Sequence, residues 1–142
     1  MNALNYSLLF LYLAIFSSCG SSDDPAETCG PEVVISGELF ATANSELLDI
    51  INININDDCL ELTMGSSGCD GERWEVNLID AEVILESFPV QRNVIISIFN
   101  DEECDAYFMR DYFFDISELR VGESGTVLLN ISNTGEQLGY DY

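Results

Sequence analysis

The stretch Ile51–Asn56, with the sequence INININ, decides the fold class, because apolar and polar side chains alternate through it without exception. A period of two is that of a β-strand with one face on the core and the other in solvent. The doublet Ile50-Ile51 breaks the phase where the strand begins, which predicts a β-bulge there.

The same alternation recurs along most of the chain, with turn residues between the segments. Asn133-Thr134-Gly135 is one such turn. Residues 80–87 contain good helix formers, but Val83-Ile84 lies among them, so we expect the extension of a strand or a single helical turn. The predicted strands cover residues 33–42, 50–56, 59–64, 74–79, 94–98, 106–116, 127–131 and, as a short closing strand, 138–142.

About seven or eight short strands of this kind predict an all-β protein, an antiparallel β-sandwich that is immunoglobulin-like or related, with the strand order open. Trp74 follows Cys69 by only five residues, so the spacing of true immunoglobulin domains is not met. We expect a signal peptide at residues 1–18, an acidic flexible tether at 19–31 and one β-sandwich domain at 32–142.

The unbroken apolar run Leu8–Phe16 is too short to span a bilayer but fits the apolar core of a secretory signal. It leads directly into Ser17-Ser18-Cys19. This segment, with Gly20 and the following Ser-Ser-Asp-Asp, resembles the processing site of bacterial lipoproteins, in particular those of the Bacteroidota. The resemblance implies that Cys19 carries the lipid at the mature N-terminus and that the protein is exported to the outer membrane, at the cell surface. An ordinary cleaved signal peptide with Cys19 in a disulfide is the alternative.

Five cysteines make an odd number, and a lipid on Cys19 would leave an even set. In an exported chain, Cys29, Cys59, Cys69 and Cys104 then predict two disulfides. Three connectivities are possible; the pairing Cys59 with Cys69 and Cys29 with Cys104 is slightly favoured because it closes one short loop. Zinc is disfavoured, because no two cysteines are two to four residues apart and the chain has no His.

The charge balance is the second strong constraint. The 142 residues hold 26 Asp and Glu against 4 Arg, with a formal net charge of −22. Nucleic acid is excluded as a partner, because no basic patch can form. Arg73, Arg92, Arg110 and Arg120 are each expected to pair with nearby acids at the surface.

The region from residue 29 to 142 also resembles a group of small Bacteroidota lipoproteins of unknown function. The residues that carry this resemblance are the segments 58–60, 66–71, 74–80, 86–93 and 114–117, and the cysteine that follows residues 100–103. The resemblance implies a compact, secreted, disulfide-bearing domain and brings no activity with it.

Three kinds of site are conceivable. Loop carboxylates could bind calcium, with Asp57, Asp58, Asp101, Glu102 and Glu103 as candidates, whereas a solvated acidic surface is the simpler reading. A pair of carboxylates could hydrolyse a glycosidic bond. The aromatic run near residue 110 could stack on sugars or dock a protein, with Tyr107, Tyr112 and Phe113 as candidates, because both strand faces carry rings.

The leading hypothesis is therefore a non-enzymatic, lipid-anchored β-sandwich that serves as a binding or structural accessory module. It has no catalytic residues and needs no cofactor, and its partner, protein or glycan, is unknown. The first alternative is a calcium-dependent glycan-binding or adhesion domain, and the second is a small carboxylate hydrolase.

Overall fold

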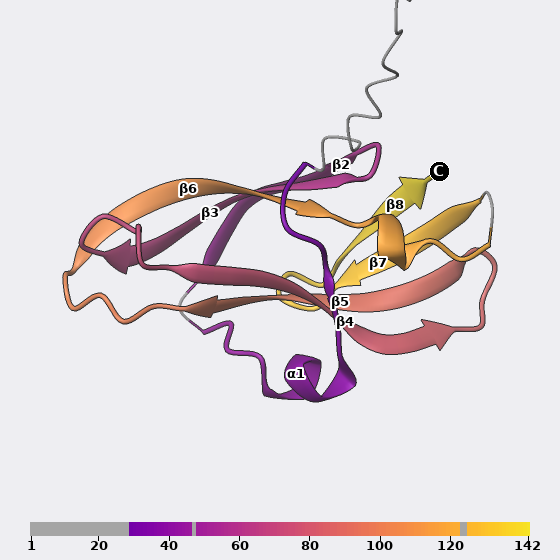
Figure 1. The fold of residues 1–142 in the computed structure, drawn as a ribbon, viewed down its shortest axis with the longest axis horizontal. Coiled ribbons are helices and arrows are strands. Elements are labelled where there is room, and N and C mark those ends of the chain that lie inside the picture. The colour runs from indigo at the N-terminus through magenta and orange to yellow at the C-terminus, as the bar shows by residue number, and fades with distance from the viewer. Residues whose placement is uncertain (1–28, 47, 123–124) are drawn as a thin grey trace, which may run out of the picture.

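The computed structural model describes residues 29–46, 48–122 and 125–142. Cys19, the signal segment and most of the predicted tether lie outside these residues. Two β-sheets face each other along the length of the domain, and one short helix lies beneath the larger sheet (Figure 1). The strands are β1 (Val34–Ile35), β2 (Asp49–Asn56), β3 (Cys59–Gly68), β4 (Glu75–Leu85), β5 (Val90–Phe99), β6 (Ala106–Asp115), β7 (Thr126–Ile131) and β8 (Glu136–Asp141).

The predicted β-sandwich is confirmed, and the structure supplies the strand order that the sequence left open. The larger sheet has the order β1-β4-β5-β7-β8, and the smaller sheet has the order β2-β3-β6. Pairing is antiparallel except for β1 with β4 and β5 with β7, which are parallel. The second parallel pair arises because the chain passes through β6 in the other sheet between β5 and β7.

The core lies between the sheets and is built from the apolar positions of the period-two pattern. β3, β5 and β7 each bury alternate residues, and Tyr140 of β8 is fully buried beside them. The predicted bulge is confirmed by the register shift between Ile50 and Asn52. The residues that alternate into the core from the three strands are Leu60, Leu62 and Met64, then Val94, Ile96 and Ile98, then Val127, Leu129 and Ile131.

The strand predicted over residues 33–42 is wrong beyond Ile35. Only β1 is extended there, and α1 (Gly37–Thr42) follows at once. Ser36 caps this helix, since its side-chain oxygen accepts from the N–H of Leu39 at 3.3 Å. By contrast, residues 80–85 extend β4 past a second register shift, between Asp80 and Ile84. Of the two structures expected there, a strand extension or a single helical turn, the strand extension is the one observed.

The favoured disulfide pairing is also wrong. The structure joins Cys29 to Cys59 and Cys69 to Cys104. Cys59 begins the ten-residue β3 and Cys69 directly follows its last residue, so the two lie about 30 Å apart and cannot form a bond with each other. The Cys29 bond also fixes the last residues of the predicted tether to the domain, where the carbonyl of Pro31 accepts from the N–H of Asp115 at 2.9 Å.

Two arginines depart from the expected surface pairing with acids. Arg110 of β6 donates to the backbone carbonyl of Asp70 rather than to a carboxylate. Arg92 of β5 is buried and binds Asp80 of β4 through two bonds, Nε to Oδ2 at 2.9 Å and Nη2 to Oδ1 at 2.7 Å. The exposed fractions of the two side chains are 7% and 0%. Arg73 pairs with Asp101 at the surface, and Arg120 with Asp58 in a partly exposed site. No helix among the described residues is long and apolar enough to cross a membrane.

Candidate functional site

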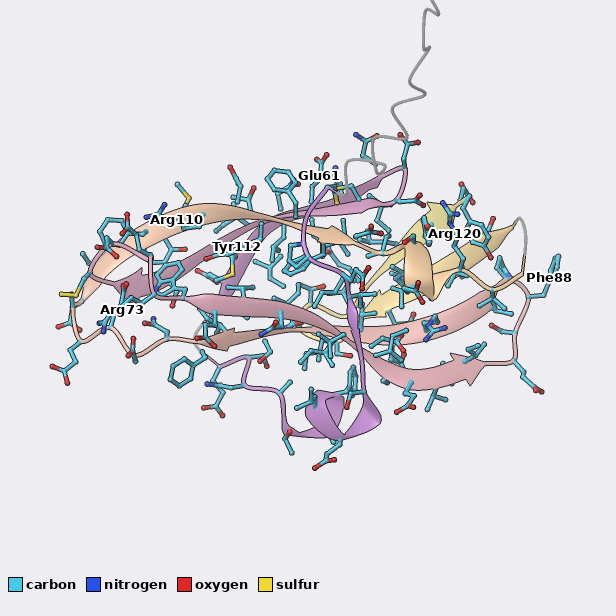
Figure 2. The ribbon with its side chains drawn as sticks, in the orientation of Figure 1. Glu61, Arg73, Phe88, Arg110, Tyr112 and Arg120 are labelled. Carbon is cyan, nitrogen blue, oxygen red and sulfur yellow. A yellow bond between two sulfur atoms is a disulfide. The ribbon has the colours of Figure 1, made fainter. Side chains whose placement is uncertain are left out.

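The outer face of the smaller sheet, which points away from the larger sheet, carries an ordered set of polar and aromatic side chains. Figure 2 shows Glu61 on this face and Tyr112 on the opposite side, between the sheets. Strand register places side chains from all three strands in rows across it. The first row is Asn54, Glu61 and Phe113, the second is Asn52, Thr63 and Asp111, and the third is Asp49, Gly65 and Met109.

Hydrogen bonds between neighbouring strands hold these polar groups in place. Asn54 donates its Nδ2 to Oε2 of Glu61 at 2.9 Å and accepts from Nδ2 of Asn52 at 3.1 Å. On the other side of β3, the hydroxyl of Thr63 donates to Oδ1 of Asp111 at 2.7 Å. Neighbouring side chains thus orient both carboxylates, and the second oxygen of each, Oε1 of Glu61 and Oδ2 of Asp111, takes no part in these bonds.

Two features border this region along the strands. At one end, the Cys29–Cys59 disulfide brings the start of the domain onto the face, and Gly30 lies against the backbone of Phe113, where a Cβ would come within 2.0 Å of its carbonyl oxygen. At the other end, Tyr107 lies across Gly65, where a side chain on residue 65 would clash with the tyrosine ring. The hydroxyl of Tyr107 donates to Oδ2 of Asp49 at 3.3 Å.

Between these borders lies a shallow depression of about 220 Å³. Tyr107, Met109 and Phe113 lie on the same side of β6 and are about half exposed, which is high for three large side chains on one strand. The depression is lined by Asn52, Asn54, Glu61, Leu62, Thr63, Asp111 and Phe113.

The aromatic candidates are therefore divided between two faces. Tyr107 and Phe113 lie on the outer face with exposed fractions of 53% and 45%, but Tyr112 packs against the core from the inner side. The inner environment raises the pKa of Tyr112, chiefly through loss of solvation. Only the first two can contact a ligand on the outer face.

Asp58 belongs to a separate cluster at the β2–β3 turn. Both of its carboxylate oxygens accept from Arg120, and one also accepts from the hydroxyl of Tyr140. Arg120 in turn donates from Nε to that hydroxyl at 3.0 Å and lies over the ring of Tyr142 at 5.5 Å. The bond from Tyr140, followed by that from Arg120, lowers the pKa of Asp58. The cluster ties the smaller sheet to β8 of the larger one.

This cluster predicts an alkaline stability loss. Burial, followed by the bond to Asp58, raises the pKa of Tyr140 to about 12, against about 10 in an unfolded chain. Because the folded value is the higher one, the contribution of Tyr140 is fully present below about pH 10 and is lost as the pH rises toward 12. Tyr140→Phe should cost about 1–3 kcal/mol at pH 7 and should lack this alkaline loss.

The measurement is urea unfolding of both proteins across this pH range. Tyr107 and Tyr112, whose pKa values are also raised, are present in both chains, so their effects cancel in the difference. Parallel stability curves for the two proteins would contradict the assignment.

Glu102 lies at the opposite end of β3 and occupies a backbone pocket. Its Oε2 accepts from the N–H groups of Cys69 at 2.7 Å, Asp70 at 3.3 Å and Gly71 at 3.0 Å. Oε1 accepts from the N–H of Arg73 at 3.4 Å. Desolvation, the largest single effect, raises the pKa of Glu102, but these backbone bonds together outweigh it and lower the pKa to about 2.

The sign of this shift predicts an acid-sensitive loop. Glu102 contributes stability above its ordinary pKa of 4.5, and the contribution is lost as the pH falls toward about 2. The protection factors of the amides of residues 69–73, that is, the intrinsic exchange rate at each pH divided by the observed rate, should therefore fall over that range in the wild type. Glu102→Gln should show lower protection factors already at pH 6, and these should change less on acidification. Glu103→Gln, at the adjacent exposed carboxylate, is the matched control and should behave as the wild type does.

The structure does not bring the candidate calcium ligands together. Asp57 and Asp58 lie at the β2–β3 turn, whereas Asp101, Glu102 and Glu103 lie in the β5–β6 loop, near the opposite end of β3. Among the described residues, no group of three or more Asp, Glu, Cys or His side chains is placed to hold a metal ion.

Calcium is accordingly expected to leave the thermal midpoint unchanged. A site of the extracellular kind, with a Kd of about 0.1–1 mM, would add about 1.4–2.7 kcal/mol at 10 mM calcium. Differential scanning calorimetry with 10 mM calcium, or with the same concentration of magnesium as the control for ionic strength, checks this. A rise specific to calcium would restore the calcium-dependent hypothesis.

The hydrolase hypothesis needs a carboxyl group whose pKa is raised so that it can act as an acid. Among the described residues, Asp58 and Glu102 have carboxyl pKa values that are lowered rather than raised, and the two lie near opposite ends of β3. These two residues therefore do not form a catalytic pair.

Comparison with known proteins shows the fold and not a family. No protein-family model matches the chain, and no curated protein matches it significantly. A solved structure of a NigD-like immunity protein from Bacteroides caccae is similar with a TM-score of 0.57 over 78% of this chain, at 8% identity. A putative toxin related protein from Parabacteroides distasonis aligns with a TM-score of 0.49 over 78% of this chain, at 16% identity. A protein of unknown function from Bacteroides vulgatus aligns with a TM-score of 0.48 over 80% of this chain, also at 16% identity.

The aligned regions span 58%, 60% and 56% of those three chains respectively. This protein therefore matches a little over half of each neighbour's length.

Sequence reasoning missed most of the residues that line the depression. The alternating asparagines of β2 were visible as a strand face, and Glu61 and Thr63 share that parity on β3. What the sequence did not show is the register that sets Asp111 and Phe113 beside them from 48 residues or more farther along the chain.

Proposed function

We propose that this chain is a lipid-anchored, non-enzymatic binding module of the bacterial outer membrane, and that the outer face of the β2-β3-β6 sheet is its binding face. The observation that carries the proposal is that half-exposed Tyr107, Met109 and Phe113 share one sheet face with oriented polar groups, and that Phe113 lines a depression among those groups. Solvated sheet faces ordinarily carry polar side chains, so large rings retained in solvent favour contact with a ligand.

The anchoring part of the proposal rests on the lipoprotein-like segment at Cys19, which precedes the described domain by ten residues. Metabolic labelling with an alkyne fatty acid tests it. The wild-type chain should be labelled, and Cys19→Ser should not. Mass spectrometry that finds an unmodified Cys19 in the mature protein would overturn this part.

The binding part is tested in intact cells by placing a photo-crosslinking amino acid at single positions. Met109 lies on the proposed face, and Phe99, at the end of β5, is an equally exposed control in the larger sheet. Crosslinks to cell-surface material should form from position 109 and not from position 99. Equal crosslinking from both positions, or none from 109, would contradict a binding role for this face.

A second candidate is immunity against a cationic toxin. It is favoured by the net charge of −22 and by the fold shared with the NigD-like immunity protein. A strain that lacks this gene should then become sensitive to secreted material from neighbouring strains, and plasmid-borne wild-type protein should restore resistance. Unchanged sensitivity across such strains would count against this candidate.

A further inference from the structure

We infer that the depression binds one ring of an uncharged carbohydrate, without a metal ion. This inference rests on the proposed function, since it names the ligand class of the same face. Three properties of the depression support it: the type of its polar groups, the exposed ring at its edge, and its charge.

The polar groups match the hydroxyls of a sugar, each of which can donate one hydrogen bond and accept others. Glu61 and Asp111 provide carboxylate oxygens as acceptors, and the amides of Asn52 and Asn54 provide N–H donors beside them. Because Asn54 and Thr63 already orient the two carboxylates, a ligand finds these acceptors fixed in advance. Such preorganisation lowers the entropic cost of binding.

Phe113 supplies the apolar part of the site. It stands opposite Glu61 in the register, so an aromatic ring and a carboxylate from neighbouring strands line the same depression. A pyranose has polar hydroxyls around its rim and C–H groups on its faces, and those C–H groups pack against the electron-rich face of an aromatic ring. Gly30 closes against the backbone of Phe113 and limits how far this residue can move.

Charge decides which sugars fit. Glu61 and Asp111 lie in the depression, and the chain carries −22 overall, so uronic acids, sulfated sugars and phosphates are repelled. None of the four arginines lines the depression. A metal-bridged sugar is not supported, because no cluster of three ligating side chains exists in the part of the chain that the structure describes.

Size limits the contact. A depression of about 220 Å³ is smaller than the roughly 300–1,000 Å³ of pockets that enclose drug-sized ligands. One ring of a longer glycan therefore occupies it, and we expect weak affinity per site, strengthened when many anchored copies bind one polymer.

The test uses the full chain in detergent and affinity gel electrophoresis in polyacrylamide containing one polymer at a time. The neutral probes are mannan, galactan, laminarin and soluble starch. The charged probes are polygalacturonate, chondroitin sulfate and poly-lysine. Migration should be retarded by at least one neutral polymer, equally with calcium or with EDTA. Phe113→Ala and Glu61→Gln should each weaken the retardation about tenfold, whereas Phe99→Ala should not change it.

The outcomes separate this inference from the proposed function. Retardation only by poly-lysine would show a cationic ligand and overturn the inference, as would retardation that EDTA abolishes. Retardation by no polymer, with photo-crosslinks still formed from position 109, would overturn the carbohydrate and leave the binding face standing. Folding of each variant is checked by circular dichroism, and Asp111→Asn serves as a second variant should Phe113→Ala unfold.

Discussion

Replacing Cys69 and Cys104 together by serine is expected to destabilise the domain by about 2–5 kcal/mol. The disulfide closes a loop of 35 residues, which lowers the chain entropy of the unfolded state. For a loop of this size, that entropy loss stabilises the folded state by about 4 kcal/mol. The disulfide also fixes the β5–β6 loop next to the backbone pocket that holds Glu102. Urea unfolding at pH 7 measures the change.

Cys29→Ser with Cys59→Ser is the matched comparison, because the second bond spans a similar 30 residues. Its removal should also accelerate hydrogen exchange at the start of the domain, whereas removal of the Cys69 bond should do so at residues 69–73. Proteolysis under non-reducing conditions should yield a peptide that joins Cys69 to Cys104. A peptide that joins Cys59 to Cys69 would contradict the pairing.

Arg92→Met is expected to cost about 3–5 kcal/mol, because it leaves Asp80 buried without its cation. Asp80 is fully buried, and its remaining bond is from the N–H of Glu82 at 2.8 Å. Arg73→Met, at an ion pair whose side chains are 59% and 50% exposed, is the control and should cost less than about 1 kcal/mol.

Asp80→Leu combined with Arg92→Met separates the two causes. The double variant removes the unpaired charge and should recover most of the stability, since apolar replacements of buried ion pairs are often neutral. A single variant as stable as the control, or a double variant as unstable as Arg92→Met, would contradict this account. Urea unfolding of all four proteins measures the differences.

The strands could be predicted because each buries one face. Ile53, Leu62 and Ile96 all follow the period-two rule, and each lies on the inner side of its strand. The rule failed at residues 37–42, because Ile35 and Leu39 share strand parity and are also four residues apart, a spacing that a helix uses as well. The hydrogen bond from the N–H of Leu39 to the Ser36 side chain favours the helix over the strand, and it forms between residues only three apart in sequence.

Contacts between distant strands could not be predicted. The disulfides, the Asp80–Arg92 pair and the neighbours of Asp111 all depend on which strands are adjacent and in what register. The alternation within one strand predicts which of its side chains share a face. It does not predict which strand lies beside it or in what register the two pair. Four cysteines allow three disulfide pairings. The two cysteines nearest in sequence, Cys59 and Cys69, are separated in space by the whole length of β3, so proximity in sequence favoured the wrong pairing.

The Cys29–Cys59 disulfide also sets the path of mechanical load. A pull that arrives through the chain before Cys29 is transmitted to the first residue of β3 rather than to β1 at the sheet edge. β3 is bonded along its length to β2 and β6, so tension along its axis is shared by many hydrogen bonds in shear. Under the proposed function, drag on a ligand held at Glu61 would therefore reach a lipid at Cys19 through the same strand and bypass the core, which would stay folded under flow.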